Sequence, residues 1–186
     1  MATKIYIDQG HNPQNPNAGA EGNGYREQDL VYTIGVMTAE RLREAGLSVR
    51  LSRPLSDTQL GSSNASSLAA RVNDANSWGA DYFISLHADA ASSDTAAGSG
   101  ALVYNLYSAA VPLAEDILVQ LNRSTGLSNR GLSSRPGLYV LRKTQMPATL
   151  IELGFITNAY DAALMASSPQ LFAAGVANGV LQFLGE

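Results

Sequence analysis

The chain contains no cysteine among its 186 residues. Disulfides, thiolate zinc sites and cysteine nucleophiles are therefore excluded together. The absence fits the cytosol, and it fits equally well the many secreted bacterial enzymes that use no disulfides. Cysteine usage alone thus does not assign a compartment.

Long apolar runs and basic clusters are also missing. No apolar run approaches the length needed to cross a bilayer, so we expect no membrane span. Lysine and arginine total 12 against 16 aspartates and glutamates, and the net charge is −4. Because no lysine/arginine run occurs, we expect neither nucleic acid nor an anionic membrane surface as a partner.

A signal peptide is not recognised at the start of the chain. Met1 to Lys4 lead straight into the apolar residues Ile5–Ile7, without the usual charged and apolar regions. We therefore expect either another route out of the cell or a catalytic domain trimmed from a longer protein.

The composition is that of a folded globular protein. Hydrophobic residues make up 45% of the chain and charged residues 15%, which is outside the range of disordered chains. A chain of this length buries about two-thirds of its unfolded surface when it folds. We therefore expect residues 1–186 to form a single domain.

Apolar strands and amphipathic helices alternate along the sequence. The expected strands are 4–7, 47–51, 81–87, 101–104, 138–141 and 148–151, and the fourth is expected to be antiparallel, at the side of the sheet. The expected helices are 27–45, 67–78 and 108–125, a short helix capped by Asn158, and a final helix from Ser168. Turn-forming residues fill 12–24, 52–67, 88–98 and 126–137. This order predicts an α/β fold: a mostly parallel twisted sheet of about six strands, flanked by helices on both faces.

Three ionisable residues fall at the ends of predicted strands. His11 and His87 are the only histidines, and Glu152 follows Ala148–Ile151 to open the apolar pentad Glu152–Ile156. A carboxylate there is costly to desolvate unless a cation, a proton or hydrogen bonds offset the cost. Ligands of such sheets bind beyond the carboxyl ends of the strands. We therefore expect one metal site beside Glu152.

His11, Glu27 and His87 are the candidate ligands. Two imidazoles and a carboxylate, with a fourth position left to water, are typical of a catalytic zinc. The spacings are 27 − 11 = 16 and 87 − 27 = 60 residues, and no His-Glu-x-x-His helix is present, so spacing is a weak signal. Each residue also has a structural interpretation: hydrogen-bonded histidines, a carboxylate at the positive end of a helix, and a protonated or salt-bridged Glu152. The pattern alone leaves both interpretations open.

Four motifs, in order, carry a resemblance to a known family. They are Asp8-Gln-Gly-His11; Gly19-Ala20-x-Gly22 with Glu27; Arg71 with the run Ala80–Ala90; and Ile151–Asn158. Together they resemble the catalytic domain of the zinc-dependent N-acetylmuramoyl-L-alanine amidases, a family of bacterial cell-separation, sporulation and phage-lysin enzymes. The resemblance extends from Ile5 to the final helix.

The resemblance implies a site and a reaction. One zinc ion per chain would be held by His11, Glu27 and His87, with Glu152 as the catalytic carboxylate. The reaction would be hydrolysis of the amide between the lactyl group of N-acetylmuramic acid and L-alanine of the stem peptide. Peptidoglycan would be the substrate, and the protein would act at the cell wall, either extracellularly or after release by lysis.

Several alternatives stay open at this stage. One is a zinc metallopeptidase that cuts another amide of a wall or capsule polymer. Another is a non-catalytic wall-binding module on the same fold. A separate wall-binding domain or an activator protein is a candidate partner, and the sequence does not separate lysin, sporulation and cell-separation roles.

Five further residues receive expected roles. Asp8 is expected either to accept the second ring proton of a ligand histidine or to cap the following turn. Asp89 stands where the family commonly has asparagine, and it would add negative charge near the metal. Arg130 and Arg142 could receive stem-peptide carboxylates, or they could be solvated or structurally paired. Arg71 is expected to be a structural ion-pair partner.

Overall fold

A six-stranded sheet organises the computed structural model, which describes residues 2–186. The strand order is β4-β1-β5-β8-β6-β7, and β4, β1, β5 and β8 are parallel neighbours. Strand β6 runs antiparallel to β8 and parallel to β7. The strands are β1 (Lys4–Gln9), β4 (Ser48–Leu51), β5 (Tyr82–Asp89), β6 (Ser99–Val103), β7 (Asn129–Ser134) and β8 (Ala148–Phe155). The expected mostly parallel sheet of about six strands is confirmed.

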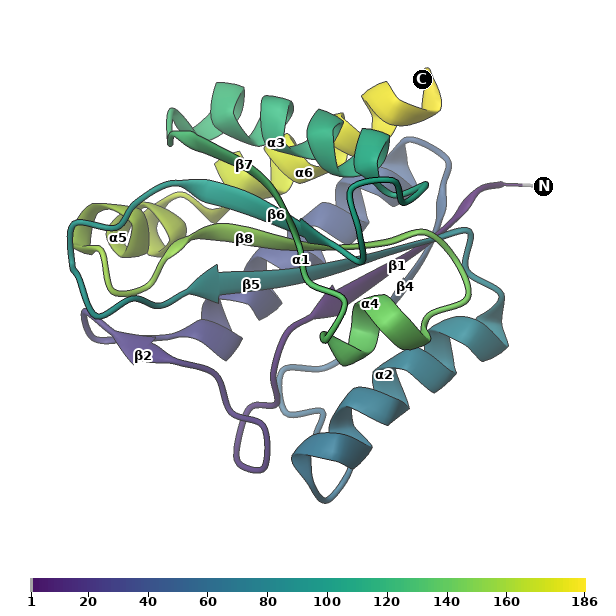
Figure 1. Cartoon of the computed structure of the whole chain (residues 1–186), viewed down its shortest axis with the longest axis horizontal. Helices are drawn as coiled ribbons and strands as arrows, with labels where there is room; N and C mark the ends of the chain where they lie inside the picture. Colours follow the sequence, from purple (N-terminus) through teal and green to yellow (C-terminus); the bar gives the residue numbers. More distant parts are fainter. Residues whose placement is uncertain (1) are drawn as a thin grey trace.

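Helices cover both faces of this sheet (Figure 1). One face carries α1 (Glu27–Glu44), α3 (Val111–Thr125) and α6 (Pro169–Leu184), and the other carries α2 (Asn64–Trp78) and α4 (Tyr139–Lys143). The short helix α5 (Ala159–Ser167) follows β8. Side chains alternate along each strand, so Ile5 and Ile7 enter the first core whereas Tyr6 enters the second.

Several predicted boundaries are close to the observed ones, and the differences have local causes. Helix α1 begins at Glu27 as expected, and Gly79 ends α2 in a left-handed conformation. Helix α2 starts earlier than expected, at Asn64, because Ser63 and Ser66 form a reciprocal capping box. Asn158 caps α5 as expected, accepting from the backbone of Tyr160 and Asp161.

Two predictions are wrong, and both concern residues 126–141. Leu138–Leu141 was expected to be a strand, but Tyr139–Lys143 is the short helix α4. The region 126–137 was expected to be a turn-rich connection, but it contains β7, which pairs with β6 at the sheet edge. Strand β6 is antiparallel as expected, although β7 lies beyond it.

The loop after β1 contains further structure. A small antiparallel hairpin, β2 (Glu21–Gly22) and β3 (Tyr25–Arg26), lies within residues 12–26 and leads directly into α1. Strand β8 also extends past Ile151 to Phe155, so Glu152 lies within a strand and not beyond its end. This extension decides which residues face Glu152.

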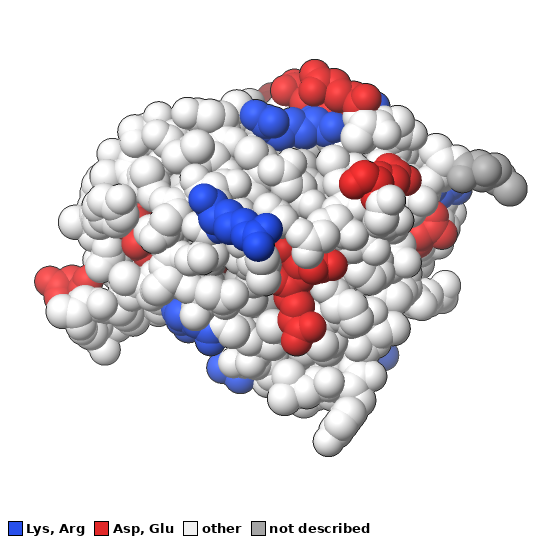
Figure 2. All heavy atoms as spheres, turned by 90° about the horizontal axis from the view of Figure 1, so that it is seen from above, with Lys and Arg blue, Asp and Glu red and all other residues white. Residues whose placement is uncertain are grey.

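Charge is sparse on the side of the molecule that carries α3. Figure 2 shows small separate groups of basic and acidic side chains with wide uncharged areas between them. That face therefore offers no continuous basic surface of the kind that follows a nucleic-acid backbone. Among residues 2–186, no helix is both long and apolar enough to cross a membrane.

Candidate metal centre

His11 lies just beyond the end of β1, in a tight turn. Its φ is 65°, in the left-handed region that residues other than glycine rarely adopt. The preceding Gly10 donates from its backbone to the Leu86 carbonyl at 3.0 Å. A Cβ at Gly10 would lie 2.5 Å from Cε1 of His87, so only glycine allows the turn to approach that imidazole.

A buried ion pair lies beneath this turn. Arg71 on α2 donates to Asp8 Oδ1 at 2.6 Å and to the Gln9 carbonyl at 2.7 Å, and Ser85 donates to Asp8 Oδ2 at 2.7 Å. Arg71 is therefore the structural ion-pair partner that its position suggested. Of the two roles expected for Asp8, the bond from a ligand histidine is not formed within residues 2–186, where Asp8 accepts from Arg71 and Ser85 instead. Burial alone would raise the pKa of Asp8, but Arg71 and Ser85 hold it below its usual value.

Glu27 joins the two histidines from the first residue of α1. Its Oε1 lies 3.1 Å from Nε2 of His11 and 3.0 Å from Nδ1 of His87, and it accepts from the Ala88 backbone at 3.0 Å. The other oxygen, Oε2, accepts from the Ala20 backbone at 3.0 Å. Burial alone would raise the pKa of Glu27, but hydrogen bonds to both histidines hold it well below its usual range.

These three side chains fit a metal ion. Their ligand atoms all lie within 4.8 Å of one another, and no other group of three or more such side chains occurs within residues 2–186. Zinc bonds of about 2.0–2.1 Å place tetrahedral ligand atoms about 3.4 Å apart, close to the two distances from Glu27. His11 and His87 remain 21% and 20% exposed, so the group opens to the surface. Two imidazoles and one carboxylate leave room for a further ligand.

Glu152 lies beside this group on the neighbouring strand. It is opposite His87 in the parallel β5–β8 register, so both side chains project from the same face of the sheet. Oε2 of Glu152 is buried and has no hydrogen-bond partner. Burial, with a contribution from the charge of Asp89, raises the pKa of Glu152 to about 7 although the charge of His87 opposes the shift. This is an acid that can gain or lose a proton near neutral pH.

A polar cavity adjoins Glu152 on the side away from His11. Arg130 donates to Asp89 Oδ2 at 3.0 Å, and its guanidinium lies 4.4 Å above the ring of Phe155. Asp89, Arg130 and Glu152 line this cavity together with Arg135, which the sequence did not single out. The sequence offered no reason to select Arg135, because residues 126–137 were expected to be a turn-rich connection and not to contain the strand β7 that Arg135 directly follows.

Arg142 does not join this cavity. It is exposed on α4 and lies outside the lining of both recesses that contain His11 or Glu152. The structure therefore separates the two arginines that the sequence had grouped: Arg130 lies near Glu152 and Arg142 does not.

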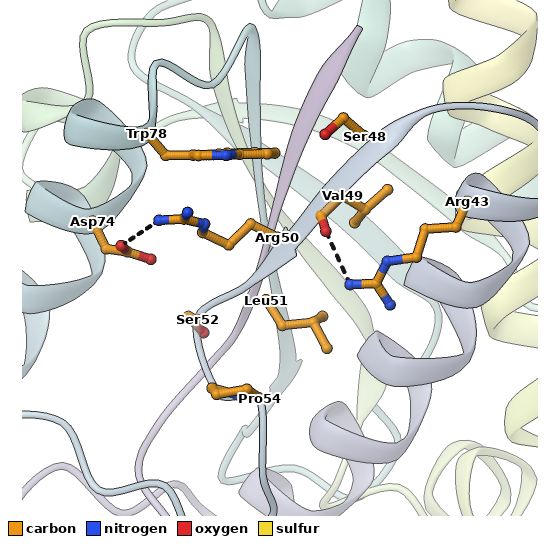
Figure 3. Close-up of a pocket in the computed structure, with 9 residues that line it drawn as sticks. All are labelled: Arg43, Ser48, Val49, Arg50, Leu51, Ser52, Pro54, Asp74 and Trp78. Atoms are coloured by element: carbon orange, nitrogen blue, oxygen red, sulfur yellow. Dashed lines mark hydrogen bonds and ion pairs between the residues drawn. The ribbon is translucent and has the colours of Figure 1, made fainter. Parts of the chain in front are cut away.

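A wider hollow of about 690 Å³ lies elsewhere, along the edge strand β4. Figure 3 shows Arg50 paired with Asp74 beside Trp78, and Arg43 bonded to the Val49 carbonyl, both at 2.9 Å. The cations there already have partners, and no histidine lines the hollow. Size alone therefore does not identify the reactive site.

Comparisons with known proteins point in one direction. The family model described as N-acetylmuramoyl-L-alanine amidase matches residues 5–182. The chain is 38% identical over 160 residues to the amidase LytC of Bacillus subtilis (strain 168), covering 85% of this chain and 30% of LytC. It is 35% identical over 182 residues to the amidase CwlM of Bacillus licheniformis, covering 95% of this chain and 67% of CwlM.

A solved structure supports the same grouping. The catalytic domain of CwlV, an N-acetylmuramoyl-L-alanine amidase from Bacillus (Paenibacillus) polymyxa var. colistinus, superposes with a TM-score of 0.85 at 28% identity. The match covers 98% of each chain. The fold described above is therefore that of this catalytic domain.

Proposed function

The chain belongs to the N-acetylmuramoyl-L-alanine amidase family, and on that premise we propose that residues 1–186 form one catalytic domain that hydrolyses the amide between N-acetylmuramic acid and L-alanine in peptidoglycan. We propose further that one zinc ion per chain, held by His11, Glu27 and His87, is required. The convergence of these three ligand atoms next to Glu152 carries the proposal.

The geometry indicates what the metal ion and its three ligand residues would each contribute. Zinc, when bound, supplies Lewis acidity towards the amide carbonyl and towards water. His11 Nε2 and His87 Nδ1, which face Glu27 Oε1, would hold it together with Glu27, and the hydrogen bonds of Glu27 favour its ionised form. The backbone donors of Ala20 and Ala88 fix both Glu27 oxygens, so the carboxylate is oriented before any ion arrives.

Glu152 is the group that moves protons. Its carboxylate takes the proton of the attacking water and then delivers it to the departing alanine nitrogen. A pKa of about 7 suits both halves of this task, because the base form is populated at neutral pH and the acid form is not too weak. Within residues 2–186 no group donates to Glu152 Oε2, so poor solvation without a compensating hydrogen bond keeps the carboxylate basic.

A non-catalytic wall-binding module on the same fold is the second candidate. A binding protein has no need for a poorly solvated carboxylate without a hydrogen-bond partner, since such a group costs stability. Glu152 therefore favours the enzyme. A metallopeptidase cutting another amide would use the same groups, and only the bond that is cut separates it from an amidase.

Mass spectrometry of fragments released from purified peptidoglycan tests the proposal, with and without a zinc chelator. We expect intact glycan strands and free stem peptides that begin with L-alanine, lost with chelator and restored by zinc. Peptides cut internally would identify a metallopeptidase instead. If no fragment is released from peptidoglycan at any zinc concentration, the wall-binding module is favoured.

A further inference from the structure

The polar cavity beside Glu152 lies on one defined side of the metal ligands. Across the sheet, the order β1-β5-β8-β6-β7 places His11, His87, Glu152, Gly100 and Arg130 in a row. The cavity, of about 160 Å³, occupies the far end of this row, above β6 and β7. A substrate group that lies beyond Glu152 on this side would face this cavity.

Gly100 forms the floor of the cavity. It is opposite Glu152 in the antiparallel β6–β8 register, so a side chain there would project from the same face as Glu152. A Cβ on Gly100 would meet nothing closer than the Gly131 carbonyl oxygen at 3.7 Å, which is ordinary van der Waals contact. Its φ is not in the left-handed range either. Neither packing nor backbone conformation requires glycine here, and the visible effect of the missing side chain is open space beside Glu152.

Two arginines supply positive charge to the cavity wall. Arg130 uses Nη1 for Asp89, which holds its guanidinium over Phe155 and leaves its other donors unbonded within residues 2–186. The Arg135 side chain donates only to the neighbouring Ser134 carbonyl, and it forms no ion pair within that described range. A guanidinium carries five donors and pairs with carboxylates through two parallel hydrogen bonds. The wall therefore retains donors suited to an anionic, planar group.

The proposed reaction fixes what reaches this wall. Glu152 delivers its proton to the leaving nitrogen, so the peptide that departs must lie on the Glu152 side of the metal ligands, towards β6 and β7. Each extended residue spans about 3.3–3.6 Å, so the residues next to the scissile amide are the ones that fall within the cavity. The acidic groups of such a peptide are carboxylates.

We propose that the cavity above Gly100 binds a free carboxylate of the leaving peptide, on the residue after L-alanine, through Arg130 and Arg135. This rests on the proposed amidase function and extends it to a substrate class: muramoyl peptides whose second residue keeps its carboxylate rather than a carboxamide. Asp89 positions Arg130, and its own negative charge directs the incoming carboxylate to the side that Arg135 faces.

Two matched substrates test this inference in the zinc-loaded protein. They are N-acetylmuramoyl-L-alanyl-D-glutamate with its γ-carboxyl amidated and its α-carboxylate free, and the same compound with the α-carboxylate also converted to a carboxamide. We expect kcat/KM to be at least about tenfold higher for the acid, in line with the strength of hydrogen bonds to charged groups. Arg130→Met and Gly100→Val should each remove this preference, mainly by raising KM for the acid.

Arg123→Met is the matched control, because it removes one positive charge from an exposed position on α3. It should keep the full preference. Equal kcat/KM for the two substrates in the unaltered protein, or a preference that survives Arg130→Met, would overturn the inference while leaving the amidase function in place.

A binding measurement separates failure of the cavity from failure of the reaction. Calorimetric titration of the metal-free protein with L-alanyl-D-glutamate γ-amide, which keeps the α-carboxylate, and with the corresponding α,γ-diamide requires no turnover. Tighter binding of the acid, lost in Arg130→Met but not in Arg123→Met, supports the carboxylate site even if mass spectrometry assigns the cut to another bond. Equal binding of the two dipeptides rejects it.

Discussion

The guanidinium of Arg71 donates to the carbonyl oxygen of His11, across 60 residues of sequence. His11 has the left-handed φ of 65°, a conformation that costs a residue other than glycine roughly 1–3 kcal/mol. Arg71 also binds Asp8 and the Gln9 carbonyl, so a single buried side chain holds the end of β1 and the turn that follows it. The direction of the His11 imidazole thus depends on a residue of α2 that does not itself reach the metal position.

Replacement of Arg71 by methionine should therefore weaken both the fold and metal binding. Asp8 would remain buried without its cation, which typically costs about 3–5 kcal/mol. Urea unfolding and a zinc competition assay with a chelator would measure the two effects. Arg50→Met is the control, because the Arg50–Asp74 pair is 43% and 44% exposed and should change stability by about 1 kcal/mol or less. Similar losses in the two variants would contradict this role for Arg71.

Metal content should depend on each histidine. We expect about one zinc per chain in the unaltered protein, in keeping with a single three-ligand site, and little or none in His11→Ala or His87→Ala. Elemental analysis after dialysis against buffered zinc gives the ratio. Full occupancy in His87→Ala would remove that residue from the ligand set.

Substitution of Glu152 by glutamine should separate catalysis from metal binding. We expect activity to fall by about 10²–10⁴-fold, the usual contribution of a general acid–base, with zinc content unchanged. Release of stem peptides and elemental analysis on the same preparation provide both readings. Retained activity would exclude Glu152 as the proton carrier.

The same substitution should stabilise the protein in mildly alkaline solution. The pKa of Glu152 in the folded protein, about 7, lies above the ordinary value of a glutamate, so the folded state binds this proton more tightly than the unfolded state does. Its contribution to stability is present below the ordinary pKa and is lost as pH rises through about 7. Glu152→Gln should therefore melt at a higher temperature than the unaltered metal-free protein at pH 8, with little difference at pH 4. A lower melting temperature of Glu152→Gln at pH 8 would mean that the pKa of Glu152 is not raised in the folded protein.

Activity should decline on the acidic side of neutrality. Glu152 must be deprotonated to accept the water proton, so kcat/KM should fall about tenfold per pH unit below about 7. Because the charge of Asp89 helps to raise this pKa, Asp89→Asn should move the acidic limb to lower pH. A pH profile of peptide release measures the shift, and Asp57→Asn, in the exposed loop before α2, serves as the charge control. An unmoved limb in Asp89→Asn would rule out this electrostatic influence.

The sequence predicted the site better than it predicted the sheet edge. Strands β1, β5 and β8 are rich in apolar and β-branched residues, so the sequence predicted that His11, His87 and Glu152 would lie at one edge of the sheet, where the structure brings them together. The pattern alone left a metal site and a structural role both open, and the family resemblance was needed to single out the ligand set with Glu27. Strand β7 has the sequence NRGLSS, which reads as a turn. It is a strand because its backbone pairs with β6, a tertiary effect that local propensity does not contain.

Two other errors have the same origin. Tyr139–Lys143 has a strand-like composition, but it forms the single-turn helix α4, in which Val140 and Leu141 pack into the core beneath α2. Asp8 was expected to accept from a ligand histidine or to cap the following turn; its partner Arg71 lies 63 residues away, and nothing in the sequence marks that pairing. Long-range partners of polar groups become visible only once the helices are placed.

The exposed edge of β4 bears on how this protein behaves when crowded. An uncovered edge strand offers unpaired backbone groups on which another chain can build a continuous sheet, the first step of aggregation. Here Arg43 already occupies the Val49 carbonyl. A strand from a second copy could use that carbonyl only after this hydrogen bond was broken. Arg43 thus makes the β4 edge a poorer template for association at high local concentration.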